Sequence, residues 1–133
     1  FVLSSIDIFK NNNQVESNDK WINFDKTEIN SLIQNDEIVF LDITADWCIT
    51  CQFNKKNVIN SKKILNLFND NNVILVRGDW TLPNNKIDNF LKEYNKFGIP
   101  FNALYSKKFP NGIIMSELLT QKEIIESFGK INQ

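Results

Sequence analysis

The sequence contains no histidine and only two cysteines among its 133 residues. A cysteine protease or a serine hydrolase of the usual triad type needs an imidazole as its base, so both mechanisms lack a part here. A structural zinc ion takes four ligands, and one cysteine pair without histidine supplies only half of the usual set, so we expect no metal site. The chemistry still open to the two cysteines is thiol–disulfide exchange, which needs two sulfur atoms and a way to make one of them a thiolate.

An excess of charge and a long apolar run are also missing. Fifteen Lys and Arg stand against sixteen Asp and Glu, and the net charge of -1 predicts no binding to nucleic acid. No uncharged apolar run approaches the roughly eighteen residues that cross a bilayer, so we expect no direct membrane insertion by this segment. The length and the 42% of hydrophobic residues predict one soluble domain with a single core, which is a monomer when isolated.

Two parts are expected along the chain. Residues 11–20 are almost all polar, so we interpret residues 1–19 as a flexible linker or N-terminal extension and residues 20–133 as the domain. The opening residues have no basic segment and no small-residue cleavage site, which makes a signal peptide a poor explanation. A linker inside a larger protein and an ordinary frayed N-terminus both fit this composition.

The pattern of apolar residues predicts a mixed α/β structure. Residues 38–44 form a continuous apolar, β-branched run with one acid inside it, which is typical of a central strand covered on both faces. Residues 73–76 predict a second buried strand, and residues 101–105 and 113–115 predict a hairpin closed by the turn at 109–112. Because helices alternate with these strands, the sheet is expected to carry helices on both faces.

Apolar residues at helical spacing predict five helices. Two capping boxes, Asp25 with Glu28 and Thr120 with Glu123, mark the start of the first and the last. Leu65 and Ile125 are expected on buried helix faces. The five helices are expected near residues 25–33, 48–57, 61–68, 87–98 and 120–128.

Cys48 and Cys51 follow directly after the predicted strand at 38–44 and begin a predicted helix. The first N–H groups and the positive end of that helix stabilise a thiolate, so we expect Cys48 to be exposed and to be the attacking sulfur. Cys51 lies one turn further along, shielded from solvent but close enough to close a disulfide, and would resolve the mixed disulfide. The alternative is two small buried residues that happen to lie three positions apart.

Asp42 and Trp47 are further candidates near the cysteines. An ionised carboxylate in a buried strand costs several kcal/mol unless it is paired, and such groups are often functional. Asp42 could exchange a proton with Cys51 during the resolving step, and the alternative is an acid on an edge strand that faces solvent. Trp47, next to the thiol, is either a docking surface or a core aromatic.

The segment at residues 44–54 resembles the active-site segment of the C-terminal domain of the DsbD family of membrane thiol reductases. It reads Thr44-Ala45-Asp46-Trp47-Cys48-Ile49-Thr50-Cys51-Gln52-Phe53-Asn54. The resemblance covers residues 20–130 and includes Trp21, Gly78-Asp79-Trp80-Thr81 and Phe97-Gly98-Ile99-Pro100.

This resemblance implies a thioredoxin fold, in which a central mixed β-sheet is flanked by helices and the CxxC lies at the N-terminus of a helix. It also implies that the Ile99-Pro100 bond is cis and faces the cysteines, so that the backbone of Ile99 can pair with an incoming substrate strand. No cofactor is implied beyond the redox-active Cys48–Cys51 disulfide. Where the family often has an acid, four residues after the second cysteine, this chain has Lys55, and a cation there would favour thiolate.

The resemblance further implies a location and partners. The domain would lie on the periplasmic side of the bacterial inner membrane as part of a membrane protein, with residues 1–19 as the linker after its last membrane helix. It would relay electrons by dithiol/disulfide exchange from the transmembrane domain to an N-terminal domain or another periplasmic acceptor. Its partners would therefore be protein thiols and disulfides, including other domains of its own chain.

Two other functions stay open. A free-standing exported thioredoxin-like reductase of the cytochrome-maturation type has the same features, and a binding module could carry the pair as a structural disulfide. Ile49 and Thr50 place no histidine or charge between the cysteines, so nothing there makes the reduced form unusually stable. This favours a reductant over a strong oxidant.

Overall fold

The computed structural model describes residues 20–133, in which a five-stranded sheet has the strand order β1-β3-β2-β4-β5. Neighbouring strands β1, β3 and β2 run parallel, whereas β4 is antiparallel to β2, and β5 is antiparallel to β4. The mixed sheet with a central strand from the 38–44 run is therefore confirmed, and the predicted linker at 1–19 lies outside the described residues. The strands are β1 (Trp21–Asn23), β2 (Val39–Thr44), β3 (Ile74–Asp79), β4 (Phe101–Tyr105) and β5 (Ile113–Ile114).

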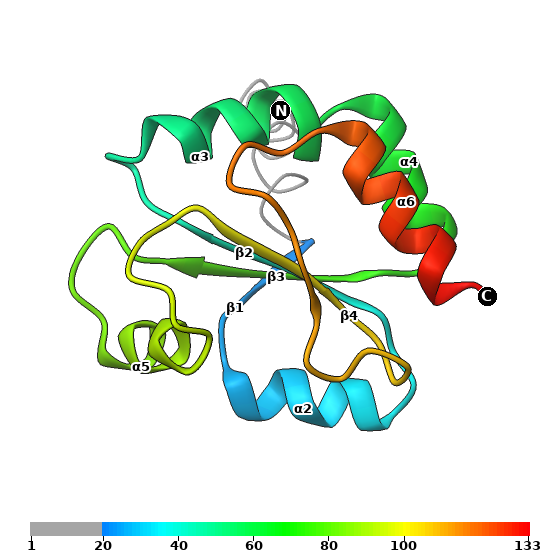
Figure 1. Cartoon of the computed structure of the whole chain (residues 1–133), viewed down its shortest axis with the longest axis horizontal. Helices are drawn as coiled ribbons and strands as arrows, with labels where there is room; N and C mark the ends of the chain where they lie inside the picture. The colour runs from blue at the N-terminus through cyan, green and yellow to red at the C-terminus, as the bar shows by residue number, and fades with distance from the viewer. Residues whose placement is uncertain (1–19) are drawn as a thin grey trace, which may run out of the picture.

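Helices cover both faces of this sheet, with α3, α4 and α6 on one side and α2 and α5 on the other (Figure 1). Asp25, Ser61 and Thr120 cap three of them by accepting hydrogen bonds from backbone N–H groups of the first turn. None of the helices within residues 20–133 is long and apolar enough to cross a membrane. The helical elements are α2 (Lys26–Gln34), α3 (Ile49–Asn54), a π-helical turn η1 (Lys55–Ile59), α4 (Lys62–Asp70), α5 (Asn85–Glu93) and α6 (Gln121–Ile131).

Four helix predictions were wrong in detail. The helix expected to reach Gly98 ends at Glu93, because Tyr94 takes the C-cap position and Asn95 adopts a positive φ of 57° that no helix continues. Leu65 and Ile125 lie on the outer edges of their helices and are partly exposed. The helix that begins after Cys48 is longer than expected, since it widens into η1 before it ends.

The strand predictions erred mainly in length. Strand β3 runs on past residue 76 to Asp79, through polar residues that the apolar pattern did not include. The three-residue strand β1 was not predicted, because so short a segment carries no alternation to read.

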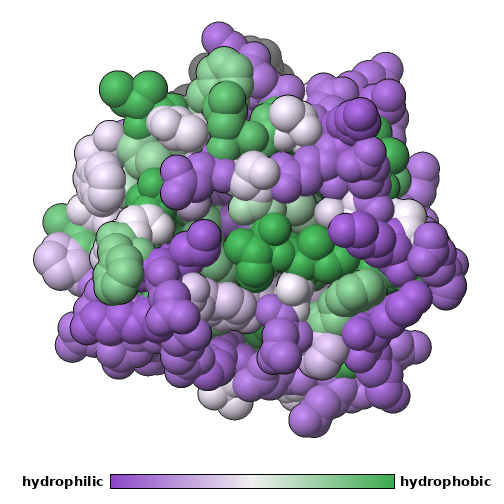
Figure 2. All heavy atoms as spheres, viewed as in Figure 1, coloured by the Kyte–Doolittle hydropathy of each residue, from purple (hydrophilic) through white to green (hydrophobic). Residues whose placement is uncertain are grey.

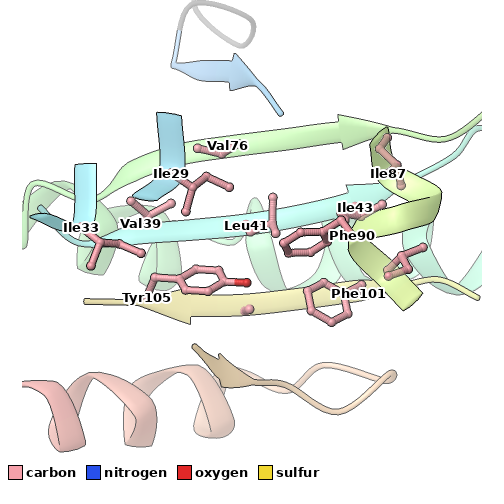
Figure 3. Close-up of a cluster of buried hydrophobic side chains, with 12 residues drawn as sticks. Ile29, Ile33, Val39, Leu41, Ile43, Val76, Ile87, Phe90, Phe101 and Tyr105 are labelled. Atoms are coloured by element: carbon pink, nitrogen blue, oxygen red, sulfur yellow. The ribbon is translucent and has the colours of Figure 1, made fainter. Parts of the chain in front are cut away.

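Strand β2 is buried along its whole length and divides the core in two. Val39, Leu41 and Ile43 point towards α2 and α5, where they pack with Ile29, Ile33, Val76, Ile87, Phe90, Leu91, Phe101, Ala103 and Tyr105 (Figure 3). Phe40 points to the other face, into the cluster formed with α4, α6 and η1. Because side chains alternate along a strand, Asp42 and Thr44 share the face of Phe40, which is the face covered by α3.

The hydropathy of the surface differs from one region of the domain to another. In the view of Figure 2, hydrophilic side chains cover α5 and α2, whereas apolar and weakly polar ones gather at the edge where α3 begins. Trp47, Ile49 and Phe97 are among the most exposed large apolar side chains of the described chain. This edge is the one that carries the two cysteines.

Asn54 ties the cysteine-bearing helix to the loop between β5 and α6. Its buried side chain donates through Nδ2 to the carbonyl of Glu117 (2.8 Å) and accepts through Oδ1 from the N–H of Leu119 (3.1 Å). Within residues 20–133, no other side chain of α3 makes a hydrogen bond to this loop. One amide therefore satisfies two backbone groups of a connection that lacks secondary structure.

Replacing Asn54 with Ala should destabilise the fold by about 1–3 kcal/mol, because the N–H of the buried Leu119 and the carbonyl of Glu117 both lose their partner. Urea unfolding with the disulfide intact measures this change. Asn57→Ala is the matched control, since Asn57 is an exposed residue of η1, and it should change stability by no more than about 0.5 kcal/mol. Equal effects of the two substitutions would contradict a role for Asn54 in holding the loop.

Candidate active site

The two cysteines form a disulfide at the start of α3, with 5.2 Å between their Cα atoms. Strand β2 ends at Thr44, and a turn closed by a hydrogen bond from Cys48 N–H to the Ala45 carbonyl (3.2 Å) brings Cys48 to the N-cap position. There its Sγ accepts a hydrogen bond from the N–H of Cys51 (3.2 Å). The predicted position of the CxxC at a helix N-terminus is confirmed, and the first turn of α3 can stabilise negative charge on Cys48.

The sulfur atoms are less accessible than the sequence suggested. Cys48 is 7% exposed and Cys51 is 1% exposed, so the expected order of exposure holds but Cys48 is not an open residue while the disulfide is closed. Ala45 and Ile99 pack against the pair. A partner must therefore approach along the narrow side on which Cys48 remains accessible.

Ile99 and Pro100 lie at the site, as predicted. The bond between them is cis, which confirms that prediction. Ile99 contacts the cluster that contains both cysteines, although 48 positions separate it from Cys51 in the sequence. Pro100 is buried at the entrance of strand β4, next to the central strand that leads to Cys48.

Trp47 lies on the surface beside the disulfide and is 60% exposed, which excludes a core role. Its indole Nε1–H donates to the carbonyl of Thr81 at 3.2 Å, so the ring is held against the loop that follows β3. Between this ring and Phe97 opens a groove of about 570 Å³. Its other lining residues are Trp80, Thr81, Pro83, Asn84, Asn85, Asp88, Gly98 and Ile99.

A small hydrogen-bond network fixes the wall of this groove. The Asp46 N–H donates to Thr81 Oγ1 (2.9 Å), and Thr81 donates to Asp79 Oδ1 through its hydroxyl (2.5 Å) and its backbone N–H (2.9 Å). The hydroxyl hydrogen bond is the main cause that lowers the pKa of the Asp79 carboxyl, and the backbone hydrogen bond adds to it. The turn before Cys48 is thereby joined to the end of β3.

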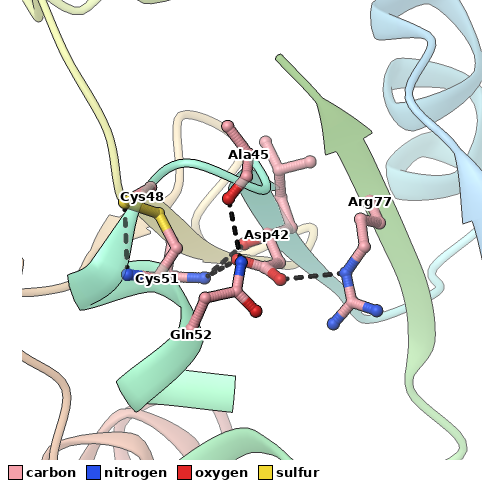
Figure 4. Close-up of polar contacts among 8 residues, drawn as sticks. Asp42, Ala45, Cys48, Cys51, Gln52 and Arg77 are labelled. Carbon is pink, nitrogen blue, oxygen red and sulfur yellow. Dashed lines mark hydrogen bonds and ion pairs between the residues drawn. A yellow bond between two sulfur atoms is a disulfide. The ribbon is translucent and has the colours of Figure 1, made fainter. Parts of the chain in front are cut away.

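Asp42 lies beneath α3 in the centre of the sheet and is 2% exposed. The alternative of an edge-strand acid facing solvent is wrong, because β2 lies between β3 and β4. Asp42 Oδ2 accepts a hydrogen bond from Arg77 Nε (3.0 Å), and Oδ1 accepts one from Asn102 Nδ2 (2.8 Å). In the view of Figure 4 the carboxylate appears between the cysteine-bearing helix and Arg77.

Lys55 follows Cys51 by four residues and is half-buried at the start of η1. Burial lowers the pKa of its ammonium group, and the positive charge of Arg77 lowers it further, whereas Asp42, Asp46 and Asp79 act in the opposite direction. Lys55, where the family often has an acid, therefore interacts electrostatically with Asp42 and Arg77.

Arg77, Asn102 and Thr81 were not identified from the sequence. A signal existed for Asn102, because a lone amide inside the apolar run Phe101–Tyr105 is as anomalous as Asp42 in its own strand. Both Arg77 and Thr81 follow the point where the apolar pattern of β3 stops. The strand register places Arg77 opposite Asp42, and the hydrogen bond from Asp46 N–H places Thr81 beside the turn before Cys48.

A disulfide at a helix N-terminus on a mixed sheet, packed against the Ile99 of a cis Ile99–Pro100 bond, defines a domain built for thiol–disulfide chemistry. The chain belongs to the thioredoxin-like family, since the family described as Thioredoxin-like matches residues 20–107. No curated protein sequence matches this chain significantly. The fold together with the CxxC disulfide supports thiol–disulfide oxidoreductase activity.

Solved structures share this fold at low sequence identity. The oxidised DsbD C-terminal domain of Neisseria meningitidis is 21% identical, with a TM-score of 0.64 over 79% of this chain and 90% of that chain. Its reduced form has a TM-score of 0.63 at 21% identity, over 82% and 98%. A thioredoxin from Thermus thermophilus is 13% identical, with a TM-score of 0.61 over 84% and 87%.

In the reduced protein at neutral pH, Cys48 should react with iodoacetamide at least about tenfold faster than Cys51, because Cys48 is the more accessible sulfur and caps the helix. Mass mapping of the alkylated peptides after a brief pulse separates the two sites. Cys48→Ser and Cys51→Ser variants provide the reference rates for each thiol alone. Equal labelling, or faster labelling of Cys51, would reverse the assignment of attacking and resolving sulfurs.

Proposed function

We propose that this domain is a protein-disulfide reductase that passes electrons between protein dithiols through Cys48 and Cys51. The observation that carries the proposal is the position of the disulfide, which lies at the N-terminus of α3 and packs against the Ile99 of the cis Ile99–Pro100 bond, while the carboxylate of Asp42 is buried on the sheet face that α3 covers. A purely structural disulfide has no need of a charged group buried in the neighbouring strand.

The reaction balances with the two cysteines alone. In the reduced domain the Cys48 thiolate attacks one sulfur of a target disulfide, a mixed disulfide forms, and the other target sulfur leaves as a thiolate. Cys51 then gives up its proton and attacks Cys48 Sγ, which releases the second target sulfur and closes the Cys48–Cys51 disulfide. Two electrons pass to the target, and a donor dithiol must return two electrons before the next cycle.

Asp42 is proposed to receive the proton that Cys51 gives up, directly or through water. It is the buried carboxylate of the strand that leads to the cysteines, and it lies on the face of the sheet covered by α3. A general base at this place makes the resolving attack faster at a pH where Cys51 itself would remain protonated.

Target recognition is proposed to use the surface around Cys48. The groove between Trp47 and Phe97 opens beside the disulfide and is mainly apolar. An extended partner segment that pairs with the backbone of Ile99 would place its cysteine at Cys48 and a side chain in this groove. Broad apolar contact of this kind suits a domain with several protein partners.

The finer proposal is a DsbD-like relay. Residues 44–54 and the Phe97-Gly98-Ile99-Pro100 segment support it, and the shared fold with the Neisseria meningitidis domain is compatible with it. In this role the domain works on the periplasmic side of the bacterial inner membrane and takes electrons from a transmembrane domain of its own protein. Its partners are then protein thiols and disulfides, with the disulfide as the sole redox group.

Cys51→Ser should trap the mixed disulfide, because Cys48 keeps its nucleophile while the resolving sulfur is gone. Incubation with a periplasmic extract should give adducts that run as higher bands on a non-reducing gel and disappear with dithiothreitol. Cys48→Ser is the control and should give none. Adducts from both variants would indicate nonspecific thiol chemistry, and adducts from neither, with oxidised acceptors demonstrably present, would favour a structural disulfide.

Asp42→Asn should slow the resolving step by about a hundredfold near neutral pH, because the proton of Cys51 loses its acceptor. Dithionitrobenzoate, an aromatic disulfide, reports this step: attack by Cys48 releases one coloured thiolate and resolution by Cys51 releases the second. At high reagent concentration the second release becomes limiting. Asp36→Asn, at an exposed turn residue, is the control. An unchanged second release across the pH range would make Asp42 a structural residue.

A further inference from the structure

Three polar side chains form a straight row across the sheet beneath α3. Asp42 on β2 is in register with Arg77 on β3 and with Asn102 on β4, so all three project from the same face. The neighbouring row, one pleat away, consists of Phe40, Leu75 and Leu104, and belongs to the apolar core. The row of Arg77, Asp42 and Asn102 therefore lies where the core gives way to the cysteine site.

We infer that Asn102 is a positioning residue for disulfide exchange, because its amide orients the Asp42 carboxylate and favours the charged, proton-accepting form. This inference rests on the proposed function of Asp42 and deepens it. Asn102 touches neither cysteine by any hydrogen bond in the described chain, and so it acts through Asp42.

The carboxylate is held at both ends. Asn102 Nδ2 donates to Oδ1 at 2.8 Å, and Arg77 Nε donates to Oδ2 at 3.0 Å, so rotation of the carboxylate would break both hydrogen bonds. Arg77 is itself fixed, because its guanidinium carbon lies 3.8 Å from the centre of the Trp21 ring. Hydrogen bonds donated to a carboxylate stabilise its ionised form relative to its protonated form.

Apolar packing does not explain an amide at this position. Asn102 is 2% exposed, and its Oδ1 has no hydrogen-bond partner among the described residues. Burying an unsatisfied carbonyl is unfavourable, whereas an apolar side chain of similar size would continue the packing of Leu104 without that cost. What the amide has and such a side chain lacks is the Nδ2 donor, which reaches Asp42 Oδ1 at 2.8 Å.

Among residues 20–133, Asn102 is also the one uncharged side chain that donates a hydrogen bond to the Asp42 carboxylate. The charged groups that act around it are Arg77 on β3 and Lys55 on η1, with Asp46 and Asp79 acting on Lys55 from the flanking loops, and the ionisable thiol of Cys51 lies on α3. A substitution of Asn102 removes its hydrogen bond to Asp42 and the longer one that its Nδ2 donates to the Leu41 carbonyl (3.5 Å), and it leaves every one of these charges in place. This makes its effect on pH dependence easier to interpret than that of Arg77 or Lys55.

The test is the pH profile of the second thiolate release from dithionitrobenzoate in Asn102→Leu. A hydrogen bond to a charged group is worth about 1.5–3 kcal/mol, and its loss should move the acid-side midpoint of the profile upward by about one to two pH units. Below the midpoint the second release should be about tenfold or more slower than in the wild type, and at high pH the two rates should converge. The first release, which reports Cys48, should keep its profile.

Three variants make the result specific. Asn102→Ala removes the same donor without adding volume and should give the same shift of the midpoint. It thereby separates the loss of the hydrogen bond from any disturbance of packing by leucine. Tyr94→Phe removes hydroxyl hydrogen bonds to Tyr105 and Asn111 on the opposite face of the sheet and should leave the profile unchanged. In Asp42→Asn the further change Asn102→Leu should have no effect on the profile, because the group it acts on is gone.

An unchanged midpoint in both Asn102 variants would overturn the inference while leaving the role of Asp42 intact. A shift that persists in the Asp42→Asn background would also overturn it, since Asn102 would then act by another route. If Asp42→Asn itself leaves the wild-type profile unchanged, the proposed role of Asp42 and the inference fall together.

Discussion

Burial of strand β2 on both faces is the constraint on which the rest of the structure depends. A strand between two sheet neighbours and two helical layers can expose nothing, so its apolar side chains must join a cluster and its charged side chain must find hydrogen-bonding partners. Val39, Leu41 and Ile43 meet the first requirement on one face. On the other face Phe40 meets it, but Asp42 needs Arg77 and Asn102 from the strands on either side. The order of the strands and the identity of these partners follow from the same burial.

Much of the site could be predicted because its signals are local. The CxxC, the strand before it and the helix after it are consecutive in sequence, and an acid inside an apolar run is anomalous wherever it occurs. The cis Pro100 segment was placed by resemblance to a family, since nothing in the composition around it distinguishes it from an ordinary turn. Trp47 was the undecided case, because whether an aromatic beside a cysteine is buried depends on segments far along the chain.

The remaining features depend on long-range pairing and could not be predicted. Arg77 reaches Asp42 only because β3 lies parallel to β2 in one particular register, and Asn102 does so because β4 is antiparallel on the other side. The end of α5 at Glu93 was missed because Asn95 takes a conformation that asparagine permits but does not require. The structural relatives at 13–21% identity share the fold, but the partners of Asp42 are known only from the structure of this chain.

The π-helical turn η1 has a consequence for sequence comparison. Its wide hydrogen bond from the N–H of Asn60 to the carbonyl of Lys55 (2.8 Å) encloses one residue more than an α-helical turn does. The turn is thus equivalent to a one-residue insertion in a helix whose two ends are fixed, by the disulfide at Cys51 and by the cap of α4 at Ser61. Deleting that residue would leave a regular helix between the same two points. An alignment of this chain with a relative that lacks the π-helical turn would therefore need a one-residue gap within η1 rather than beside the cysteines.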